Sequence, residues 1–193
     1  MSKPRPHGPV PNAVRLHEAA LAHLARFAAT EASLRRVLQS RIDRWARAAE
    51  QAGEADVAPR AAQARQEAAA VARKLAAAGT VDDAAFAESR VRRLLRSGRS
   101  RRGALAHLAQ KGVDAETAGA ALPVNEASEL DAALAFCRRR RFGPFAREPG
   151  DAEAHRRALG AFGRAGFGRD VAEQALGMTP EDATDRLLAT RQT

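Results

Sequence analysis

Apolar residues recur every three to four positions along most of the chain, which is the spacing of one buried helix face. A first stripe after Val14 comprises Leu16, Ala20, Leu24 and Phe27. A second stripe comprises Leu34, Val37, Leu38, Ile42 and Trp45. Thr30 precedes the second stripe and is suited to cap a helix. We therefore predict helices over residues 14–27 and 30–48.

The pattern continues as a string of helices separated by polar, glycine or proline breaks. Residues 53–59 end in Pro59 and are predicted to form a loop before a helix over 60–78. The next expected helix begins at Asp82 and ends at Gly98. Its predicted buried stripe comprises Ala84, Ala87, Val91, Leu94 and Leu95.

Two short helices are expected next. Ser100 is suited to cap a helix that ends at Gly112, with Leu105 among its inward residues. Asp114 is suited to cap a second helix that ends near Leu122.

Further helices are expected in the last third of the chain. Ser128, with Asp131 three residues later, resembles a capping box and predicts a helix with Cys137 inward. After a Gly-Pro break, a helix is expected over 151–165 and a short one up to residue 176. Thr179, followed by a proline, predicts the start of the last helix.

An internal repeat groups these helices into modules. Residues 111–122 align without gaps with residues 165–176, so that Gly112 matches Gly166. Each copy closes two preceding helices, which defines a three-helix module. Such units bury too little core alone, so we predict tandem modules stacked into an elongated, curved array. The expected parts are a disordered lead (1–12), a divergent first module (13–79) with a polar insertion near 50–60, a central module (80–123), a third module (127–177) and a C-terminal helix and tail (179–193).

Composition supports the same fold class. Of 193 residues 48 are alanine, while aromatic residues make up 4% and tyrosine is absent. Alanine is the best helix former and strand formers are scarce, so we expect an all-α protein. Cys137 is the only cysteine, which excludes an internal disulfide. We expect a cytoplasmic protein with neither a signal peptide nor a membrane span.

Positive charge is concentrated in two stretches. The formal net charge is +9, and thirteen basic residues lie in two acid-free segments, 90–111 and 132–147, so the rest of the chain carries −4. A GC-rich genome also enriches alanine and arginine together, so the position of the charge carries more weight than its total. The candidate partner-binding residues are Arg90, Arg92, Arg93, Arg96, Arg99, Arg101, Arg102, Lys111, Arg138, Arg139, Arg140 and Arg141. The alternatives are a solvated helix face and, for the second run, a favourable interaction with a helix C-terminus.

Neither a catalytic nor a metal-binding pattern emerges from the sequence. Among the histidines only His17 and His23 have a spacing worth testing, and they project to different helix faces. Asp82 and Asp83 diverge by about 100° on a helix, so we interpret them as helix-start residues and not as a catalytic pair. Cys137 has no histidine or second cysteine nearby in sequence and is interpreted as a core residue. We expect no enzymatic activity, no metal and no cofactor.

Residues 81–122 carry a combination of motifs that resembles one family. A helix starts Asp-Asp-x-x-Phe-Ala, a basic helix ends at glycine, a leucine-rich helix ends Lys-Gly-Val, and a short helix ends Ala-Leu. This combination resembles the central module of the RecX family, the bacterial regulators of the RecA recombinase. The third module is similar, and the motif residues interpreted as structural are Asp82, Asp83, Phe86, Gly112, Val113, Gly166 and Phe167. The first module departs from the pattern, because Arg41 stands where glycine is expected and the helix should continue through Trp45.

The resemblance implies a partner and an activity. RecX-like proteins bind in the helical groove of the RecA filament on single-stranded DNA, hinder its extension and reduce its ATPase, strand-exchange and co-protease activity. The resemblance therefore implies that this protein regulates RecA in DNA repair and the SOS response, and that the basic residues form its contact surface. We expect a monomer.

Two alternatives stay open at this point. One is a helical protein that binds the phosphates of single-stranded or duplex DNA directly. Base-specific readout by a helix-turn-helix over 100–122 is disfavoured, because residues 114–122 hold no Arg, Lys, Asn or Gln. The other alternative is a helical scaffold with a different partner.

Overall fold

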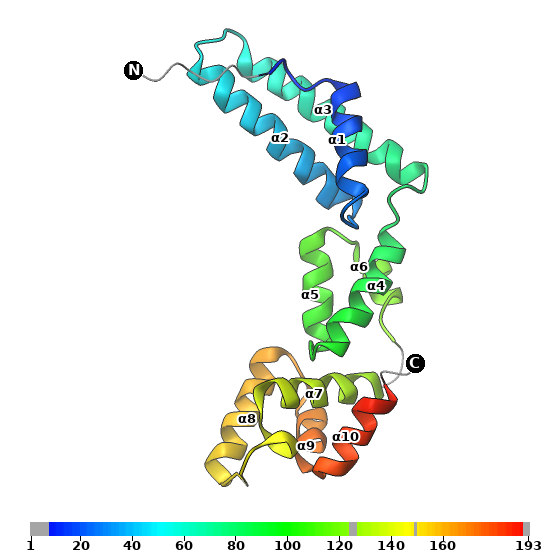
Figure 1. Ribbon diagram of the computed structural model, residues 1–193, viewed down its shortest axis with the longest axis vertical. Coiled ribbons are helices and arrows are strands. Elements are labelled where there is room, and N and C mark those ends of the chain that lie inside the picture. Colours follow the sequence, from blue (N-terminus) through cyan, green and yellow to red (C-terminus); the bar gives the residue numbers. More distant parts are fainter. Residues whose placement is uncertain (1–7, 124–126, 149, 191–193) are drawn as a thin grey trace. The chain divides into compact units, whose positions relative to one another are not determined.

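The protein is all α-helical over the residues that the computed structural model describes, 8–123, 127–148 and 150–190, and no strand occurs among them (Figure 1). The all-α prediction is confirmed. The helices are α1 (Ala13–Leu24), α2 (Glu31–Gln51), α3 (Val57–Ala77), α4 (Asp83–Arg96), α5 (Arg101–Lys111), α6 (Ala115–Ala120), α7 (Ala127–Arg140), α8 (Ala152–Ala165), α9 (Arg169–Gly177) and α10 (Pro180–Ala189), with a 3-10 turn η1 (Gly143–Phe145).

The contacts between residues divide the chain into two compact units. Unit 1 comprises Met1–Phe86 with Lys111–Val113, and unit 2 comprises Ala87–Gln110 with Asp114–Thr193. The division into three modules and their stacking into a curved array stay predictions. Residues 1–7 of the expected N-terminal lead and 191–193 of the expected tail lie outside the described residues.

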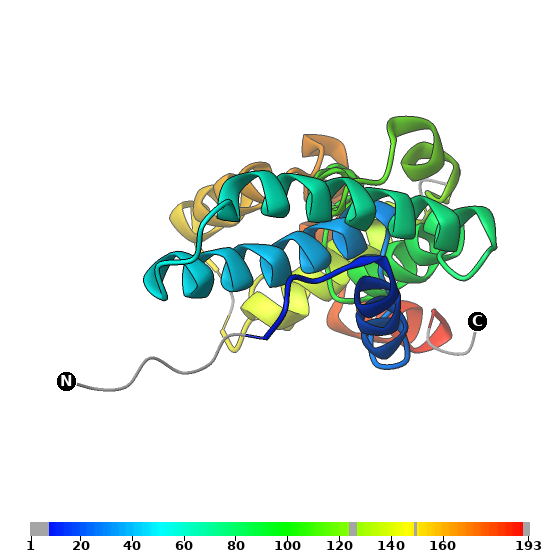
Figure 2. The same ribbon diagram turned by 90° about the horizontal axis from the view of Figure 1, so that it is seen from above.

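Unit 1 is built on three helices with a thin, alanine-rich core. α2 and α3 lie side by side and antiparallel, and α1 packs across α3 (Figure 2). α2 continues through Trp45, as predicted, and this side chain is 7% exposed. Large side chains of α1 and α2 therefore pack on small side chains of α3, which lets the helices approach closely. The residues at the centre are Leu16, Leu34, Leu38, Ile42, Ala61, Ala64, Ala68 and Val71.

Four expectations for unit 1 are wrong. Phe27 lies beyond the end of α1 and is 52% exposed, and Val37 is 38% exposed. Ala84, in the first turn of α4, is exposed as well. α3 begins at Val57 and not at residue 60, because Pro59 lies in its first turn, where a backbone N–H has no acceptor within the helix.

Unit 2 is organised around α7, most of whose side chains are buried. Phe136 of α7 packs with Phe142, Phe162 and Phe167, at centroid separations of 5.2–5.5 Å. Tilted and edge-on ring pairs of this kind add to the stability gained by burial. The aromatic residues of this chain are few, and four of them pack together in unit 2.

Two expectations for unit 2 are also wrong. Ser128 lies inside the first turn of α7, so it does not form the expected capping box with Asp131. The Asp131 carboxylate instead accepts a hydrogen bond from Arg186 Nε at 2.6 Å. Leu105 is 38% exposed, because Ala104 and Leu108 occupy the inward positions of α5.

The same hydrogen-bond arrangement occurs once in each unit. In unit 1, the Thr30 hydroxyl caps α2 and donates to the Lys111 carbonyl at 2.6 Å. In unit 2, the Ser100 hydroxyl caps α5 and donates to the Ala165 carbonyl at 2.6 Å. Lys111 and Ala165 are equivalent positions of the internal repeat. The repeat therefore includes a contact as well as a series of helices.

A carboxylate completes each arrangement. The backbone N–H of Glu31, next to Thr30, donates to Asp83 Oδ1 at 2.9 Å. The backbone N–H of Arg101, next to Ser100, donates to Glu129 Oε2 at 2.9 Å. The first N–H groups of α2 and α5 have no acceptor within their own helices, so these carboxylates satisfy them.

Candidate partner-binding surface

The arginines of α4 lie on its exposed face. Val91 and Leu95 are buried, while Arg92, Arg93 and Arg96 are exposed. The helical period explains this division, because residues one turn apart share a face. An outward basic face is therefore present on α4.

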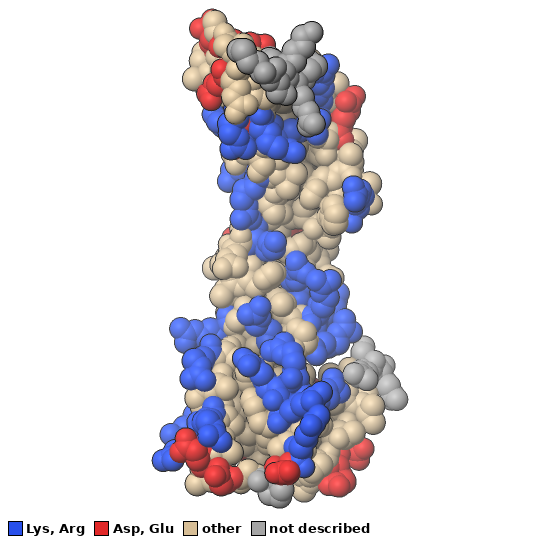
Figure 3. Space-filling view, turned by 60° about the vertical axis from the view of Figure 1, so that its left-hand side comes forward, with Lys and Arg blue, Asp and Glu red and all other residues tan. Residues whose placement is uncertain are grey.

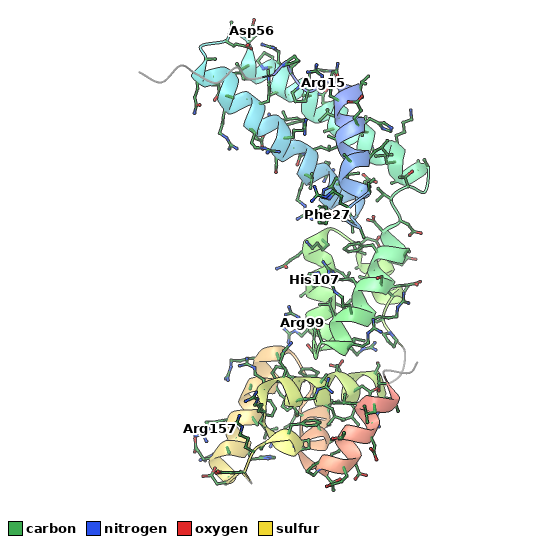
Figure 4. All side chains as sticks on the ribbon, in the orientation of Figure 1. Arg15, Phe27, Asp56, Arg99, His107 and Arg157 are labelled. Carbon is green, nitrogen blue, oxygen red and sulfur yellow. The ribbon has the colours of Figure 1, made fainter. Side chains whose placement is uncertain are left out.

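The turn between α4 and α5 lies against the backbone of α7. Gly98 in this turn has φ +78°, and a Cβ there would lie 2.6 Å from the backbone nitrogen of Phe136. Only glycine combines this backbone conformation with so close an approach. Arg139 of α7 donates to the Ser97 carbonyl at 2.8 Å. The two basic stretches thereby meet within unit 2, and Arg99 lies at their junction (Figure 4).

A groove of about 440 Å³ lies among α4, α7 and α10 in unit 2. Its apolar lining includes Leu95 and Leu187. The charged lining comprises Arg92, Arg96, Arg138 and Asp131, and Asp131 is paired with Arg186. Figure 3 shows basic side chains gathered over the face of unit 2 that is turned to the viewer. An apolar floor edged by guanidinium groups suits a partner segment that is acidic and carries an apolar side chain.

Three of the candidate arginines make contacts that maintain the fold. The guanidinium of Arg101 donates to the carbonyl of Pro123. Arg139 and Arg140 lie over the Phe136 ring, 5.5 and 5.7 Å from its centroid. Two arginines of the α7 run therefore contact a core ring of unit 2. The alternative interpretation of this run also gave it a structural role, but through the helix C-terminus.

The other candidates differ in their position. Arg90 is half-buried, and the half-buried Lys111 belongs to unit 1. Arg92 approaches Glu88 at 3.7 Å, an exposed pair that contributes little to stability. Six candidates are exposed in unit 2 and form no ion pair or cation–π contact among the described residues: Arg93, Arg96, Arg99, Arg102, Arg138 and Arg141.

The motif residues lie at helix ends and in the cores. Asp82 Oδ1 accepts from the Ala85 N–H at 2.8 Å at the start of α4. Phe86 is half-buried, while Val113 and Phe167 are buried. Asp83 belongs to the repeated arrangement of unit 1. Gly112 and Gly166 directly follow the accepting carbonyls of Lys111 and Ala165, and both have a positive φ.

Cys137 is a core residue, as its position on α7 predicts. Its side chain is fully buried, and burial raises the pKa of the thiol to about 12. The thiolate, which is the reactive form, is therefore scarce at neutral pH. Among the residues that the structure describes, no group of three metal-ligating side chains lies together. Within the same residues, no helix is long and apolar enough to cross a membrane.

One basic feature is missing from the sequence-based candidates. Between residues 33 and 49, α2 carries five arginines and a single acid, Asp43. Summing the charge over all of the chain outside the two acid-free stretches conceals this excess. A count over single helices reveals it, and the residues are Arg35, Arg36, Arg41, Arg44 and Arg47, all exposed.

Comparison with known proteins places the chain in a family. Residues 82–122 match the family model described as "RecX, second three-helix domain". The chain is 38% identical over 168 residues to the regulatory protein RecX of Myxococcus xanthus, covering 86% of each chain. The chain belongs to the RecX family. It is also 43% identical over 107 residues to the regulatory protein RecX of Agrobacterium fabrum, covering 55% of this chain and 57% of that protein.

Membership of the RecX family agrees with the location of the motifs. The match over 82–122 begins with the carboxylates at the start of α4 and ends after α6. It therefore includes Arg92 and Arg96 of α4, which line the groove of unit 2.

Proposed function

We propose that this RecX family member is a non-enzymatic, cytoplasmic regulator of the RecA recombinase. It binds the RecA filament on single-stranded DNA and inhibits filament extension, ATP hydrolysis, strand exchange and co-protease activity. Its role is then the regulation of DNA repair and of the SOS response. Its relation to two curated proteins named regulatory protein RecX supports this proposal.

The observation that carries the proposal is the basic groove of unit 2. Arg96 and Arg138 come from the two acid-free stretches and line one groove together with Leu187. A protein partner with acidic side chains gains ion pairs at the edge of this groove and buries an apolar side chain at its floor. Occupation of neighbouring RecA subunits by such contacts inhibits the movements that ATP hydrolysis and filament growth require.

The test is a charge reversal confined to exposed arginines. We expect Arg93→Glu, Arg96→Glu and Arg138→Glu together to abolish inhibition of RecA ATPase on single-stranded DNA. Arg101 is left unchanged, because it donates to Pro123 and its loss would perturb the fold. Helical content by circular dichroism should equal that of the wild type.

A matched control separates the groove from net charge. Arg73→Glu, Lys74→Glu and Arg157→Glu change the charge by the same amount at exposed positions outside the groove. This variant should inhibit RecA as the wild type does. Full inhibition by the groove variant, or equal loss in both variants, contradicts the proposal.

The same variants also test direct action on DNA. The wild type and the groove variant should be titrated with single-stranded and duplex DNA at two salt concentrations, without RecA. Tight binding with a steep salt dependence, lost in parallel with inhibition, would identify DNA phosphates as the target of the groove.

A further inference from the structure

A second basic pocket lies in unit 1, separate from the groove of unit 2. It has a volume of about 420 Å³ and forms where the segment before α1 lies against α2. Arg15 on the first turn of α1 contributes to it (Figure 4). The lining residues that matter here are Pro9, Pro11, Arg15, Arg41, Arg44 and Trp45.

Three guanidinium groups line this pocket without a neighbouring carboxylate. Within the described residues, no acidic side chain forms an ion pair with Arg15, Arg41 or Arg44. The acid closest in sequence to the last two, Asp43, is bound to Arg65 at 2.8 Å. The pocket therefore has an uncompensated positive charge, which attracts an anion.

The wall of the pocket also holds an unsatisfied donor. Trp45 is 7% exposed, and its Nε1–H has no acceptor within the described part of the chain. The guanidinium of Arg60 lies 5.0 Å from the centroid of the indole ring. An anionic oxygen in the pocket would accept from the arginines, and it reaches the buried indole N–H only if the side chains around Trp45 shift.

The surface next to the pocket extends this basic character along α2. Arg36, Ser40, Arg44 and Arg47 share the face opposite the buried stripe, and the exposed Val37 lies at its edge, one turn before Arg41. Arg36 and Arg47 are about 16 Å apart along the helix axis at the usual rise per residue. A single small anion cannot span this length, whereas a polyanion can.

The composition of this stripe favours nucleic acid over a protein partner. The centre of a protein interface is apolar, whereas this stripe consists of arginine and serine, with the single exposed Val37 at its edge. Arginine is typical of contacts to phosphate oxygens, which position a strand without reading its bases, while the Ser40 hydroxyl already donates to the Arg36 carbonyl. The buried Trp45 leaves no exposed ring in the pocket for base stacking.

We propose that the pocket of Arg15, Arg41, Arg44 and Trp45 binds a phosphate of a single-stranded nucleic acid, whose backbone continues along Arg36 and Arg47. This site is independent of the groove in unit 2 and of the proposed action on RecA. It would bind the strand without base preference.

The full-length chain provides its own probe for this site. Trp45 is the only tryptophan, and tyrosine is absent, so intrinsic fluorescence reports on the pocket. We expect a (dT)20 oligonucleotide to change the Trp45 emission in a saturable manner. The same change should occur in the Arg93→Glu, Arg96→Glu, Arg138→Glu variant, whose groove is altered. Loss of RecA inhibition in the groove variant with an unchanged Trp45 response would show that the two sites act separately. The pocket proposal can therefore fail while the proposed function holds, and the reverse.

Removal of the pocket arginines should weaken this binding. Arg15→Ala, Arg41→Ala and Arg44→Ala together should reduce affinity for (dT)20 roughly tenfold or more, and lower the salt slope by about 2. The control Arg35→Ala, Arg73→Ala, Lys74→Ala removes equal charge from exposed positions outside the pocket and should keep the affinity within about twofold. Unchanged affinity and slope in the pocket variant would overturn the proposal.

Two further measurements cover the remaining outcomes. If the pocket variant loses helical content, Arg41→Lys with Arg44→Lys retains the charge and should still weaken binding, because lysine lacks the bidentate geometry. Polyglutamate of equal charge and inorganic phosphate serve as competing probes. Displacement of (dT)20 by polyglutamate at equal concentration would instead identify an acidic-protein site, and displacement by millimolar phosphate a small-anion site. Either result overturns the proposal.

Discussion

The Ser100 hydroxyl donates to the Ala165 carbonyl at 2.6 Å, joining the start of α5 to the end of α8. The same hydroxyl accepts from the N–H of Gly103 at 3.1 Å, so it caps α5 at the same time. Thr30 makes the equivalent pair of contacts in unit 1. Thr30 and Ser100 are both fully buried. One small side chain therefore fulfils a local and a tertiary role at once.

Replacement of Ser100 should destabilise unit 2. In Ser100→Ala, α5 loses its cap and the Ala165 carbonyl loses its donor, so we expect the free energy of unfolding to fall by about 2–3 kcal/mol. Urea unfolding followed by circular dichroism measures this change. Ser97→Ala is the control, because the Ser97 hydroxyl is exposed and donates only within its own turn, to the carbonyl of Leu94. A loss in Ser100→Ala no larger than in the control would show that the contact with Ala165 is unimportant.

Replacement of Gly112 should be more costly than replacement of another glycine in the same unit. Gly112 has φ +84°, and a Cβ there would lie 2.3 Å from the Cβ of Ala32. Gly79 has φ +71° with nothing within 4 Å of a Cβ. Gly79→Ala should therefore cost only the backbone strain, about 1–2 kcal/mol, while Gly112→Ala adds the steric clash.

Trp45 fluorescence during urea unfolding compares these two variants, since Trp45 lies in the core of unit 1. The midpoint for Gly112→Ala should be clearly lower than for Gly79→Ala. Equal midpoints would mean that Ala32 moves away without cost.

Cys137 should resist thiol reagents in the folded protein. Its side chain is fully buried and burial raises the pKa of the thiol to about 12, so modification requires opening of unit 2. We expect the rate with a disulfide reagent at pH 8 to be far below that of the urea-unfolded chain. Ser100→Ala should increase the rate. Rapid labelling of the native wild type would be incompatible with a buried α7.

Glu129 should make stability decrease as the pH rises. Burial raises the pKa of its carboxyl group above the ordinary value of 4.5, more than the Arg101 N–H and charge lower it. The folded state therefore holds the proton more tightly than the unfolded state. The favourable contribution is complete below pH 4.5 and is lost as the pH rises through the raised value.

Glu129→Gln removes the charge and keeps an oxygen that accepts from Arg101. The variant should be more stable than the wild type at pH 7.5, and the difference should disappear near pH 4. Urea midpoints over this range measure the effect. A wild type that is the more stable protein at pH 7.5 would show that attraction to Arg101 outweighs burial.

Helix positions follow from the sequence where the signal is local. The caps at Thr30, Asp114 and Thr179 are confirmed, because each side chain bonds to an N–H three residues along. The prediction failed at Ser128, which lies inside the first turn of α7 and not before it. It also failed at Pro59, which fits the first turn of a helix as well as a loop.

The sequence predicts which segments are helical better than it predicts which side chains are buried. Phe27 and Leu105 have the right period for their stripes, yet both are exposed. Alanine is so frequent that several faces of each helix are weakly apolar, and the neighbouring helix decides which of them is buried. The arginines of α2 were concealed for a related reason, because charge summed over several helices cancels.

By itself, the sequence determined the all-α class, four helix caps, the repeat and the resemblance to the RecX family, since these depend on residues close together along the chain. The four caps are Thr30, Ser100, Asp114 and Thr179. The tertiary structure alone decided which arginines are exposed and which are used in packing. It also brought Arg96 and Arg138 to one groove, and Arg15 and Arg44 to one pocket. The reason is physical: a charge contributes to a binding site only beside other charges, and helix packing sets those distances.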